Sequence, residues 1–245
     1  MAETFVLIHG AWHGAWCWAA VKRRLEAGGD RSFALDLPAH GDNHHDPAKV
    51  TRTMYVESVA KFITDHDLRN VVLVGHSLGG LTISGVAQEI PSRIKRLIYA
   101  TALVPRDGVS IGDDLATFMS PGAVAAMHGL AEGAPVVTVD DQRFRANFLQ
   151  DGSPGLQDFV LSALVPEPTL PMSDPVPMKE LYRLNIPTGY VVCEDDLVFD
   201  DPKVWHPNLS GRLRNPAIRS IKCGHELMFS RPLETAKALA EMARL

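Results

Sequence analysis

Short and almost uninterrupted apolar runs alternate along this chain with segments of helical periodicity. One of the apolar runs, NVVLVG (70–75), contains almost no polar residue. A strand that is apolar on both faces must be covered on both faces, as in a parallel sheet between two layers of helices. The alternation therefore predicts an α/β fold. Six such runs are expected to be strands: 5–9, 32–38, 70–75, 96–104, 188–193 and 217–222.

The alternation stops at Pro105 and resumes after Pro187. Between them the chain is rich in Pro and Gly, and its helical pieces are short and weakly periodic. A chain of 245 residues can form one large α/β domain with an insertion. We therefore expect residues 1–104 and 188–245 to form one core domain and residues 105–187 to form a cap over the strand ends.

Charge, apolar runs and cysteine spacing argue against several classes of protein. The formal net charge is −5 and no block of Lys and Arg stands out, which disfavours a nucleic-acid partner. No apolar run approaches the roughly 20 residues of a membrane span, and the N-terminus lacks the pattern of a secretory signal. The sequence thus predicts no membrane partner and a cytoplasmic location. Three cysteines without metal-type or redox-type spacing are expected to be free thiols: Cys17, Cys193 and Cys223.

The strongest local signal is GHSLGG (75–80), which follows one apolar run and precedes a helical pattern. This is the context in which G-x-S-x-G forms a sharp strand-to-helix turn with an exposed hydroxyl. A glycine-rich turn in which the serine only caps a helix is the alternative. The flanking strand and helix favour Ser77 as a nucleophile.

A serine nucleophile needs a base, and the base needs an orienting acid. In this architecture they follow the serine in the order acid, then histidine. His225 comes after the strand at 217–222 and is the expected base. The acid is expected in the cluster Glu194, Asp195 and Asp196, which follows the strand at 188–193. We choose Asp196, with Asp195 as the alternative.

The loop after the first strand contains the unit HGAW twice, at 9–12 and 13–16. Two short copies do not make a repeat protein. His9 and His13 are four residues apart, but a zinc pair at this spacing needs a helix, which the neighbouring glycines oppose. The second histidine-rich stretch, HGDNHHDP (40–47), has the composition of a solvated connection. We therefore expect no metal and no cofactor.

Nearly the whole chain resembles small α/β-hydrolases of the group that contains methyl-salicylate-type esterases and hydroxynitrile lyases. The resemblance implies a mainly parallel six-stranded sheet with helices on both faces and a small inserted cap. The lyases carry Thr after the first His of the N-terminal loop and Lys after the catalytic His; Gly10 and Glu226 stand here instead, which favours an esterase. The matching stretches are VLIHGAWHGAWCW, LDLPAHG, VVLVGHSLGG, SALVPEP, YVVCEDDLVF and GHELMFSRP.

Acyl transfer also needs donors for the oxyanion, normally the amide after the nucleophile and one from the loop after the first strand. These are expected to be the backbone N–H groups of Leu78 and Ala11. Apolar side chains of the cap and of the acid loop are expected to form a mainly apolar pocket. The expected substrate-binding residues are Gly10, Trp12, Phe118, Phe144, Phe148, Val198 and Phe199, and Met119, Leu161 and Met172 are further candidates.

The sequence thus predicts a serine hydrolase that cleaves a small apolar or aromatic carboxylic ester, a methyl ester or a lactone through an acyl-enzyme. Two alternatives use the same fold: a cofactor-free oxygenase that relies on the His–Asp pair, and a ligand receptor that keeps the residues without turnover. The expected partner is a small-molecule ester, and the resemblance leaves room for a homodimer.

Overall fold

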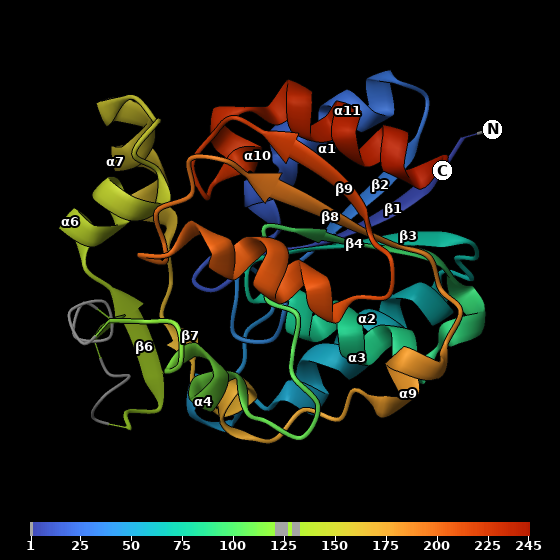
Figure 1. Cartoon of the computed structure of the whole chain (residues 1–245), viewed down its shortest axis with the longest axis horizontal. Coiled ribbons are helices and arrows are strands. Elements are labelled where there is room, and N and C mark those ends of the chain that lie inside the picture. Colours follow the sequence, from blue (N-terminus) through green and yellow to red (C-terminus); the bar gives the residue numbers. More distant parts are fainter. Residues whose placement is uncertain (1, 121–126, 129–132) are drawn as a thin grey trace.

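The computed structural model describes residues 2–120, 127–128 and 133–245. Its centre is a six-stranded sheet in which every neighbouring pair is parallel, in the order β2-β1-β3-β4-β8-β9 (Figure 1). The predicted α/β-hydrolase architecture is confirmed. The strands are β1 Thr4–Ile8, β2 Arg31–Leu35, β3 Val71–His76, β4 Ile94–Ala100, β8 Thr188–Cys193 and β9 Ala217–Ile221.

Helices cover both faces of this sheet (Figure 1). Alternate residues of a strand point to opposite faces, and in β1 Val6 and Ile8 join the buried cluster that includes helices α2 and α3, whereas Phe5 and Leu7 join the cluster that includes α1 and α11. This is why the strands read as continuous apolar runs. The covering helices are α1 Ala19–Ala27, α2 Arg52–Asp65, α3 Gly79–Glu89, α10 Leu227–Ser230 and α11 Pro232–Ala243.

The helix boundaries follow from capping. The Thr51 hydroxyl accepts a hydrogen bond from the Met54 amide and begins α2, and the Ser153 hydroxyl does the same for Leu156 at the start of α7 (Pro154–Ala163). Short 3-10 or π turns complete the connections: Ala15–Trp18, Pro47–Lys49, Pro91–Arg93, Phe144–Phe148, Pro202–Val204, Trp205–Leu209 and Ser210–Arg212.

The strand β4 ends earlier than the sequence predicts. The apolar run continues to Val104, but β4 ends at Ala100 because Thr101 has a φ of 39°, which a strand cannot contain. The Thr101 hydroxyl donates instead to the Asp196 carboxylate, at 2.8 Å. The end of this strand is therefore part of the site described below.

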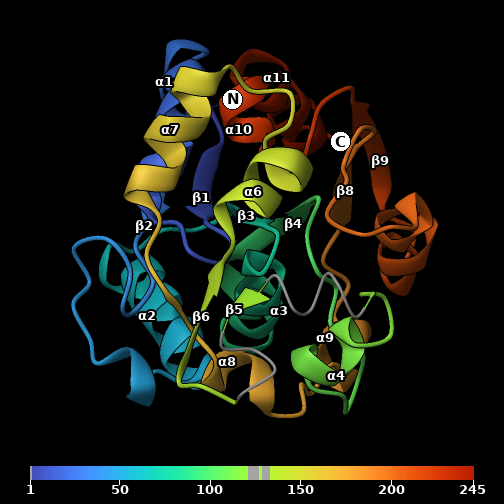
Figure 2. The same ribbon diagram turned by 90° about the vertical axis from the view of Figure 1, so that its left-hand side faces the viewer.

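The inserted segment, residues 105–187, leaves the sheet after β4 and returns at β8. In Figure 2 its α6 and β6 lie in front of the sheet, at the end toward which the strand arrows of Figure 1 point, whereas α8 lies below the sheet and packs against α2 and α4. Its last helix, α9, packs beside α3 instead. The elements are α4 Ile111–Leu115, β5 Met127–His128, β6 Val136–Val139, α6 Asp141–Arg143, α7, β7 Glu167–Pro168, α8 Leu170–Ser173 and α9 Lys179–Arg183, and β5, β6 and β7 form a small antiparallel sheet.

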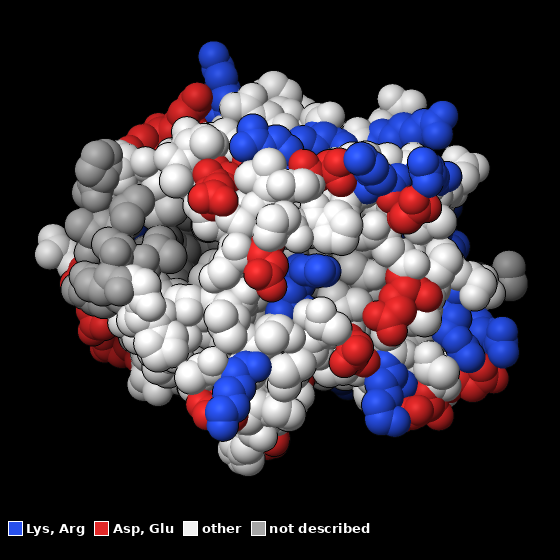
Figure 3. Space-filling model, turned by 90° about the horizontal axis from the view of Figure 1, so that it is seen from below, with Lys and Arg blue, Asp and Glu red and all other residues white. Residues whose placement is uncertain are grey.

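The surface and the cysteines agree with the composition. On the face shown in Figure 3, Lys and Arg side chains are interleaved with acidic ones. No helix of the described part of the chain is both long and apolar enough to cross a membrane. Cys17, Cys193 and Cys223 are buried free thiols, as predicted.

Candidate active site

Ser77 lies in the turn between β3 and α3, with a φ of 49°. This left-handed conformation is uncommon for a residue with a side chain, and it persists only where the surroundings impose it. Close packing imposes it here, because a Cβ on Gly79 would lie 2.6 Å from the His9 carbonyl oxygen and one on Gly80 would lie 2.0 Å from that of Leu103. The small residues of GHSLGG therefore create the strained turn that exposes the hydroxyl.

His225 and Asp196 are adjacent, although 29 residues separate them. The His225 Nδ1 lies 2.6 Å from the Asp196 Oδ2, and both side chains are buried. Because a carboxylate only accepts, His225 donates from Nδ1 and its Nε2 keeps a lone pair. The other Asp196 oxygen accepts from the Val198 amide at 3.0 Å. Glu194 and Asp195 are exposed, so Asp196 is the member of the acidic cluster that contacts His225.

Two carboxylates act on the protonation of His225. Burial alone would lower its pKa, but the attraction and hydrogen bond of Asp196, together with the attraction of Glu226, outweigh burial and raise the pKa. Glu226 is itself buried and lies 3.5 Å from His13 Nε2. It faces the 9–13 loop, a contact that its sequence position did not reveal.

His76 contacts both the backbone and the ring of His225. Its Nε2 donates to the His225 carbonyl oxygen at 3.1 Å, and the two rings are 4.8 Å apart. Burial, followed by the charges of His225 and His13, holds the pKa of His76 well below its usual value, so this ring stays neutral. The sequence did not single it out, although it lies within GHSLGG.

Among the described residues, one group has the geometry to hold a metal ion: His76, His225 and Glu226 offer ligand atoms within 4.8 Å of one another. An ion coordinated by the His225 Nε2 would occupy the lone pair that otherwise accepts a proton, so His225 could not then act as a base. The pair His9 and His13, which the sequence disfavours as a zinc site, is not on a helix, because His9 follows β1 and His13 precedes the turn at Ala15.

Two backbone carbonyls of the 9–13 loop accept hydrogen bonds from the loop's own histidines. His9 Nδ1 donates to the Gly10 oxygen at 2.8 Å, and His13 Nδ1 donates to the Ala11 oxygen at 2.7 Å. Within the described residues, neither the Ala11 nor the Leu78 amide donates to a protein acceptor, and both residues line the main cavity. The loop therefore presents an unpaired donor beside Ser77.

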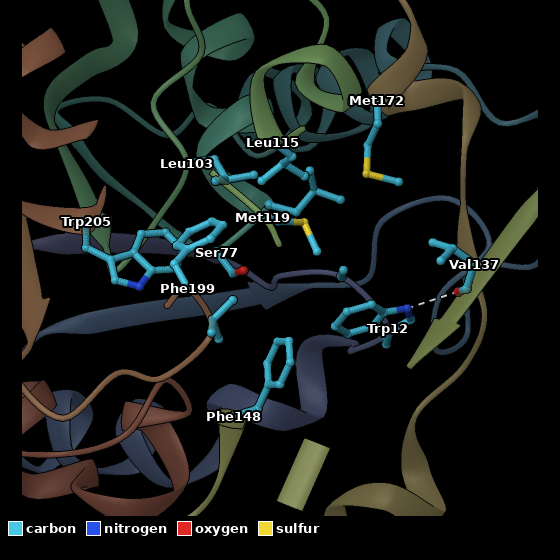
Figure 4. A pocket seen from close by; sticks show the side chains of 14 residues that line it. Trp12, Ser77, Leu103, Leu115, Met119, Val137, Phe148, Met172, Phe199 and Trp205 are labelled. Carbon is cyan, nitrogen blue, oxygen red and sulfur yellow. Dashed lines mark hydrogen bonds between the residues drawn. The ribbon is translucent and has the colours of Figure 1, made fainter. Parts of the chain in front are cut away.

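The main cavity, defined as the one that Ser77 lines, has an almost entirely apolar wall and a volume of about 60 Å³. Figure 4 shows the Ser77 hydroxyl at its centre, with Trp12 and Phe148 on one side and Leu103 and Trp205 on the other. Trp205 and Phe148 also contact the His225 ring, at 5.2 and 5.4 Å between centroids. The lining residues are Ala11, Trp12, Ser77, Leu78, Leu103, Gly112, Leu115, Met119, Val137, Phe148, Met172, Val198, Phe199 and Trp205.

No hydrogen bond joins Ser77 to His225 in the described structure, and the buried His225 Nε2 has no partner there. Contacts of this kind are often long before a ligand binds. The two residues nevertheless share neighbours. Ser77 lines the same cavity as Trp205 and Phe148, and both of these rings pack against the His225 ring.

Several expected lining residues do not line this cavity. Phe144 is fully buried behind Phe148, with the two rings stacked 5.5 Å apart. Phe118 packs against Phe199 and lies under the Arg212 guanidinium.

Gly10 and Leu161 are also absent from the lining of this cavity. At Gly10 there is no room for a side chain, since a Cβ would lie 2.8 Å from that of Ser77. Leu161 lines a second pocket, to which Trp12 also contributes. Conversely, Trp205, Leu103 and Val137 line the main cavity without having been predicted, since apolar character alone does not tell which cavity a side chain faces.

The expectation of a solvated HGDNHHDP loop is wrong for its first residue. His44, His45 and Asp46 are exposed, but His40 is buried and its Nε2 lies 2.8 Å from the Glu167 carboxylate of the inserted segment. Burial would lower the pKa of His40, but the attraction and hydrogen bond of Glu167 outweigh it, and the pKa is raised. The partner is 127 residues away, which explains why the local sequence did not reveal it.

Similar proteins agree with this architecture over the whole chain. Methylesterase 2 of Arabidopsis thaliana is 30% identical over 245 residues, which cover 94% of this chain and 92% of that protein. A pyrethroid hydrolase of Sphingobium wenxiniae is 31% identical over 255 residues, with coverage of 97% and 86%. The solved structure of an extracellular alpha/beta-hydrolase from a Paenibacillus species has a TM-score of 0.90 at 28% identity, and the match covers 99% of this chain and 100% of that one. That protein is described as sharing structural and functional homology with Tobacco Salicylic Acid Binding Protein 2.

These likenesses confirm the resemblance to methylesterase-type proteins that the sequence motifs indicated. The model of the alpha/beta hydrolase family matches residues 5–238, from the first strand into the last helix. That range includes Ser77, Asp196 and His225. The chain belongs to the alpha/beta hydrolase family.

Proposed function

We propose that this protein is a carboxylic ester hydrolase with Ser77 as nucleophile, His225 as base and Asp196 as the orienting acid. The observation that carries the proposal is the buried contact of 2.6 Å between His225 Nδ1 and Asp196. It leaves the lone pair of His225 Nε2 free beside the cavity that Ser77 enters from a strained turn. The methylesterase and pyrethroid hydrolase relatives support ester hydrolysis as the reaction.

The proposed reaction has two halves. The Ser77 oxygen attacks the ester carbonyl carbon while His225 Nε2 takes the hydroxyl proton, and the resulting oxyanion accepts from the Ala11 and Leu78 amides. The tetrahedral intermediate collapses to an acyl-enzyme, and His225 returns the proton to the departing alcohol. Water then attacks the acyl carbon, His225 takes its proton, and Ser77 leaves with that proton as the free acid forms.

The cavity wall supports an uncharged substrate with an apolar or aromatic part. Met119, Met172 and Phe199 contribute wall surface, and none of the lining side chains carries a charge. A charged substrate group would lose its hydration there without gaining a partner. A small ester, methyl ester or lactone of this kind fits the proposal. The inserted segment, residues 105–187, would then act as a cap, since it supplies Val137 and Phe148 to this wall.

Substitution of Ser77 tests the proposal directly. We expect wild-type protein to turn over p-nitrophenyl acetate repeatedly, and Ser77→Ala to lower kcat by at least about 10³-fold, as loss of a serine nucleophile does in other hydrolases. A serine-directed phosphonate should label the wild-type protein and not the variant. Thr101→Ser, which keeps the hydroxyl donor to Asp196, should remain active.

The same experiment discriminates the two alternatives. Oxygen-dependent turnover that survives in Ser77→Ala would favour a cofactor-free oxygenase, and a single round of Ser77 labelling without turnover would favour a ligand receptor. Either result would contradict the proposed hydrolase. The cytoplasmic location and a homodimer stay predictions from the sequence.

A further inference from the structure

Glu167 belongs to the inserted segment, yet its carboxylate is buried among residues of three core segments. Its Oε1 accepts from the Tyr55 hydroxyl at 2.8 Å, and its Oε2 accepts from the His40 ring at 2.8 Å and from the Trp12 amide at 3.0 Å. Only 1% of the residue is exposed. A buried carboxylate is stable only with such partners, so these contacts fix where β7 sits on the core.

Trp12 forms three hydrogen bonds with the inserted segment, one through its amide, one through its carbonyl oxygen and one through its indole. Besides the amide on Glu167, its carbonyl oxygen accepts from the Val165 amide at 2.9 Å, and its indole Nε1 donates to the Val137 oxygen at 3.0 Å. The φ of Trp12 is 67°, a conformation that a residue with a side chain adopts only when its surroundings impose it. Here the inserted segment supplies those constraints.

The contact with Glu167 fixes one peptide unit beside the cavity. The unit between Ala11 and Trp12 has its oxygen held by the His13 ring at 2.7 Å and its N–H held by Glu167. The unit before it contains the Ala11 N–H, and its oxygen is held by the His9 ring at 2.8 Å. A rotation of the peptide unit between Ala11 and Trp12 would turn Ala11 and move the Ala11 amide away from the carbonyl oxygen of a bound ester.

We propose that Glu167 is a positioning residue for ester hydrolysis: by holding the Trp12 amide, it aims the Ala11 N–H at the oxyanion. The inference rests on the proposed function of the preceding section. Glu167 does not touch the substrate, and His40 on the same carboxylate supplies a positive charge when protonated, which limits the repulsion of a nearby oxyanion. Docking of the inserted segment thereby completes the catalytic geometry and does more than cover the cavity.

The test separates transition-state geometry from substrate binding. We would measure kcat and KM for a p-nitrophenyl ester, and the inhibition constant of a trifluoromethyl ketone that forms a tetrahedral oxyanion with Ser77. In Glu167→Ala we expect kcat and the affinity for the ketone to fall together by about tenfold to hundredfold, because a displacement of the order of 1 Å in a catalytic group costs that much, while KM changes little.

Two variants serve as controls. Glu167→Gln places an amide oxygen where it can accept from Trp12, with its NH₂ group toward the Tyr55 oxygen, and should recover most of kcat. Tyr55→Phe removes one of the three hydrogen bonds to the same carboxylate without touching Trp12, and should leave kcat and the ketone affinity unchanged even where it lowers the melting temperature. If Glu167→Ala does not fold, Glu167→Asp, which retains the charge but withdraws it from Trp12, should lower the ketone affinity relative to KM.

The outcomes distinguish this inference from the proposed function. If Ser77→Ala abolishes turnover but the Glu167→Ala or Glu167→Asp variant keeps the wild-type ketone affinity and kcat, only the positioning role is wrong. Equal losses of kcat in Tyr55→Phe and Glu167→Ala would also overturn it, because general destabilisation would then account for both. If wild-type protein hydrolyses no ester, or Ser77→Ala hydrolyses it equally well, the proposed function itself fails.

Discussion

At the scale of single residues, burial with a fixed partner decides what each histidine can do. His76 and His9 are buried, and their pKa values are held well below the ordinary value, whereas Asp196 raises the pKa of His225 despite equal burial. A ring of the same chemistry therefore serves as a neutral support in one place and as the proposed base in another. The difference lies in whether a carboxylate contacts the ring.

The pH dependence of kcat/KM should report the raised pKa of His225. The base must be neutral to accept a proton, so activity should rise as the pH passes this pKa, with a midpoint above the ordinary ~6.5. Glu226→Gln removes one of the charges that raise the pKa, and its midpoint should move to lower pH. Asp195→Asn removes an exposed neighbouring carboxylate and should leave the midpoint in place. A wild-type midpoint below 6.5, or equal midpoints in wild type and Glu226→Gln, would contradict this assignment.

At the scale of elements, the packing of α3 on the strand ends determines the shape of the nucleophile turn. Gly80 is the second residue of α3, and a Cβ there would lie 2.0 Å from the Leu103 carbonyl oxygen. Gly155 is the second residue of α7, and a Cβ there would have no neighbour within 4 Å. The two glycines have the same place in their helices but opposite surroundings.

These two positions give a matched pair of substitutions. Gly80→Ala should lower the free energy of unfolding by about 1–3 kcal/mol or more, because the backbone must move to relieve the overlap. Gly155→Ala should raise it by roughly 0.5–1 kcal/mol, because alanine costs less backbone entropy in a helix. Urea denaturation followed by far-UV circular dichroism measures both. Equal effects of the two substitutions on the free energy of unfolding would contradict the close packing of α3 against the Leu103 carbonyl.

At the scale of the whole molecule, the inserted segment and the sheet share one core. Phe148 and Met178 of the insertion belong to the same buried cluster as Val6 and Ile8 of β1. The buried hydrogen bonds of Glu167 and Trp12 join the same two parts. A segment that buries its apolar side chains against the core domain gains little stability alone, so the two parts should fold together.

We therefore expect a single unfolding transition. Loss of ester hydrolysis, of near-UV circular dichroism and of far-UV circular dichroism should have one midpoint, and the calorimetric and van't Hoff enthalpies should agree. A core formed by residues 1–104 joined to 188–245 should not reach the same melting temperature. Activity that disappears in a separate earlier transition, while the far-UV signal persists, would mean that the insertion unfolds as an independent unit.

The sequence by itself determined the parallel sheet, the order of its elements and the turn that carries Ser77. These features depend on local patterns: apolar runs of strand length, helical periodicity, and small residues around a serine. The choice of Asp196 and His225 also came from the sequence, because both follow strands whose carboxyl ends lie at one edge of a parallel sheet. Their catalytic roles remain proposals.

Only the tertiary structure decided which side chains meet. The contacts of Glu167 with Trp12, His40 and Tyr55 join residues more than 100 positions apart. Periodicity predicts that a side chain is buried but not which partner it meets, since that depends on how the inserted segment docks. For the same reason the sequence placed Phe144 in the cavity wall and missed Trp205, although both are buried aromatic residues.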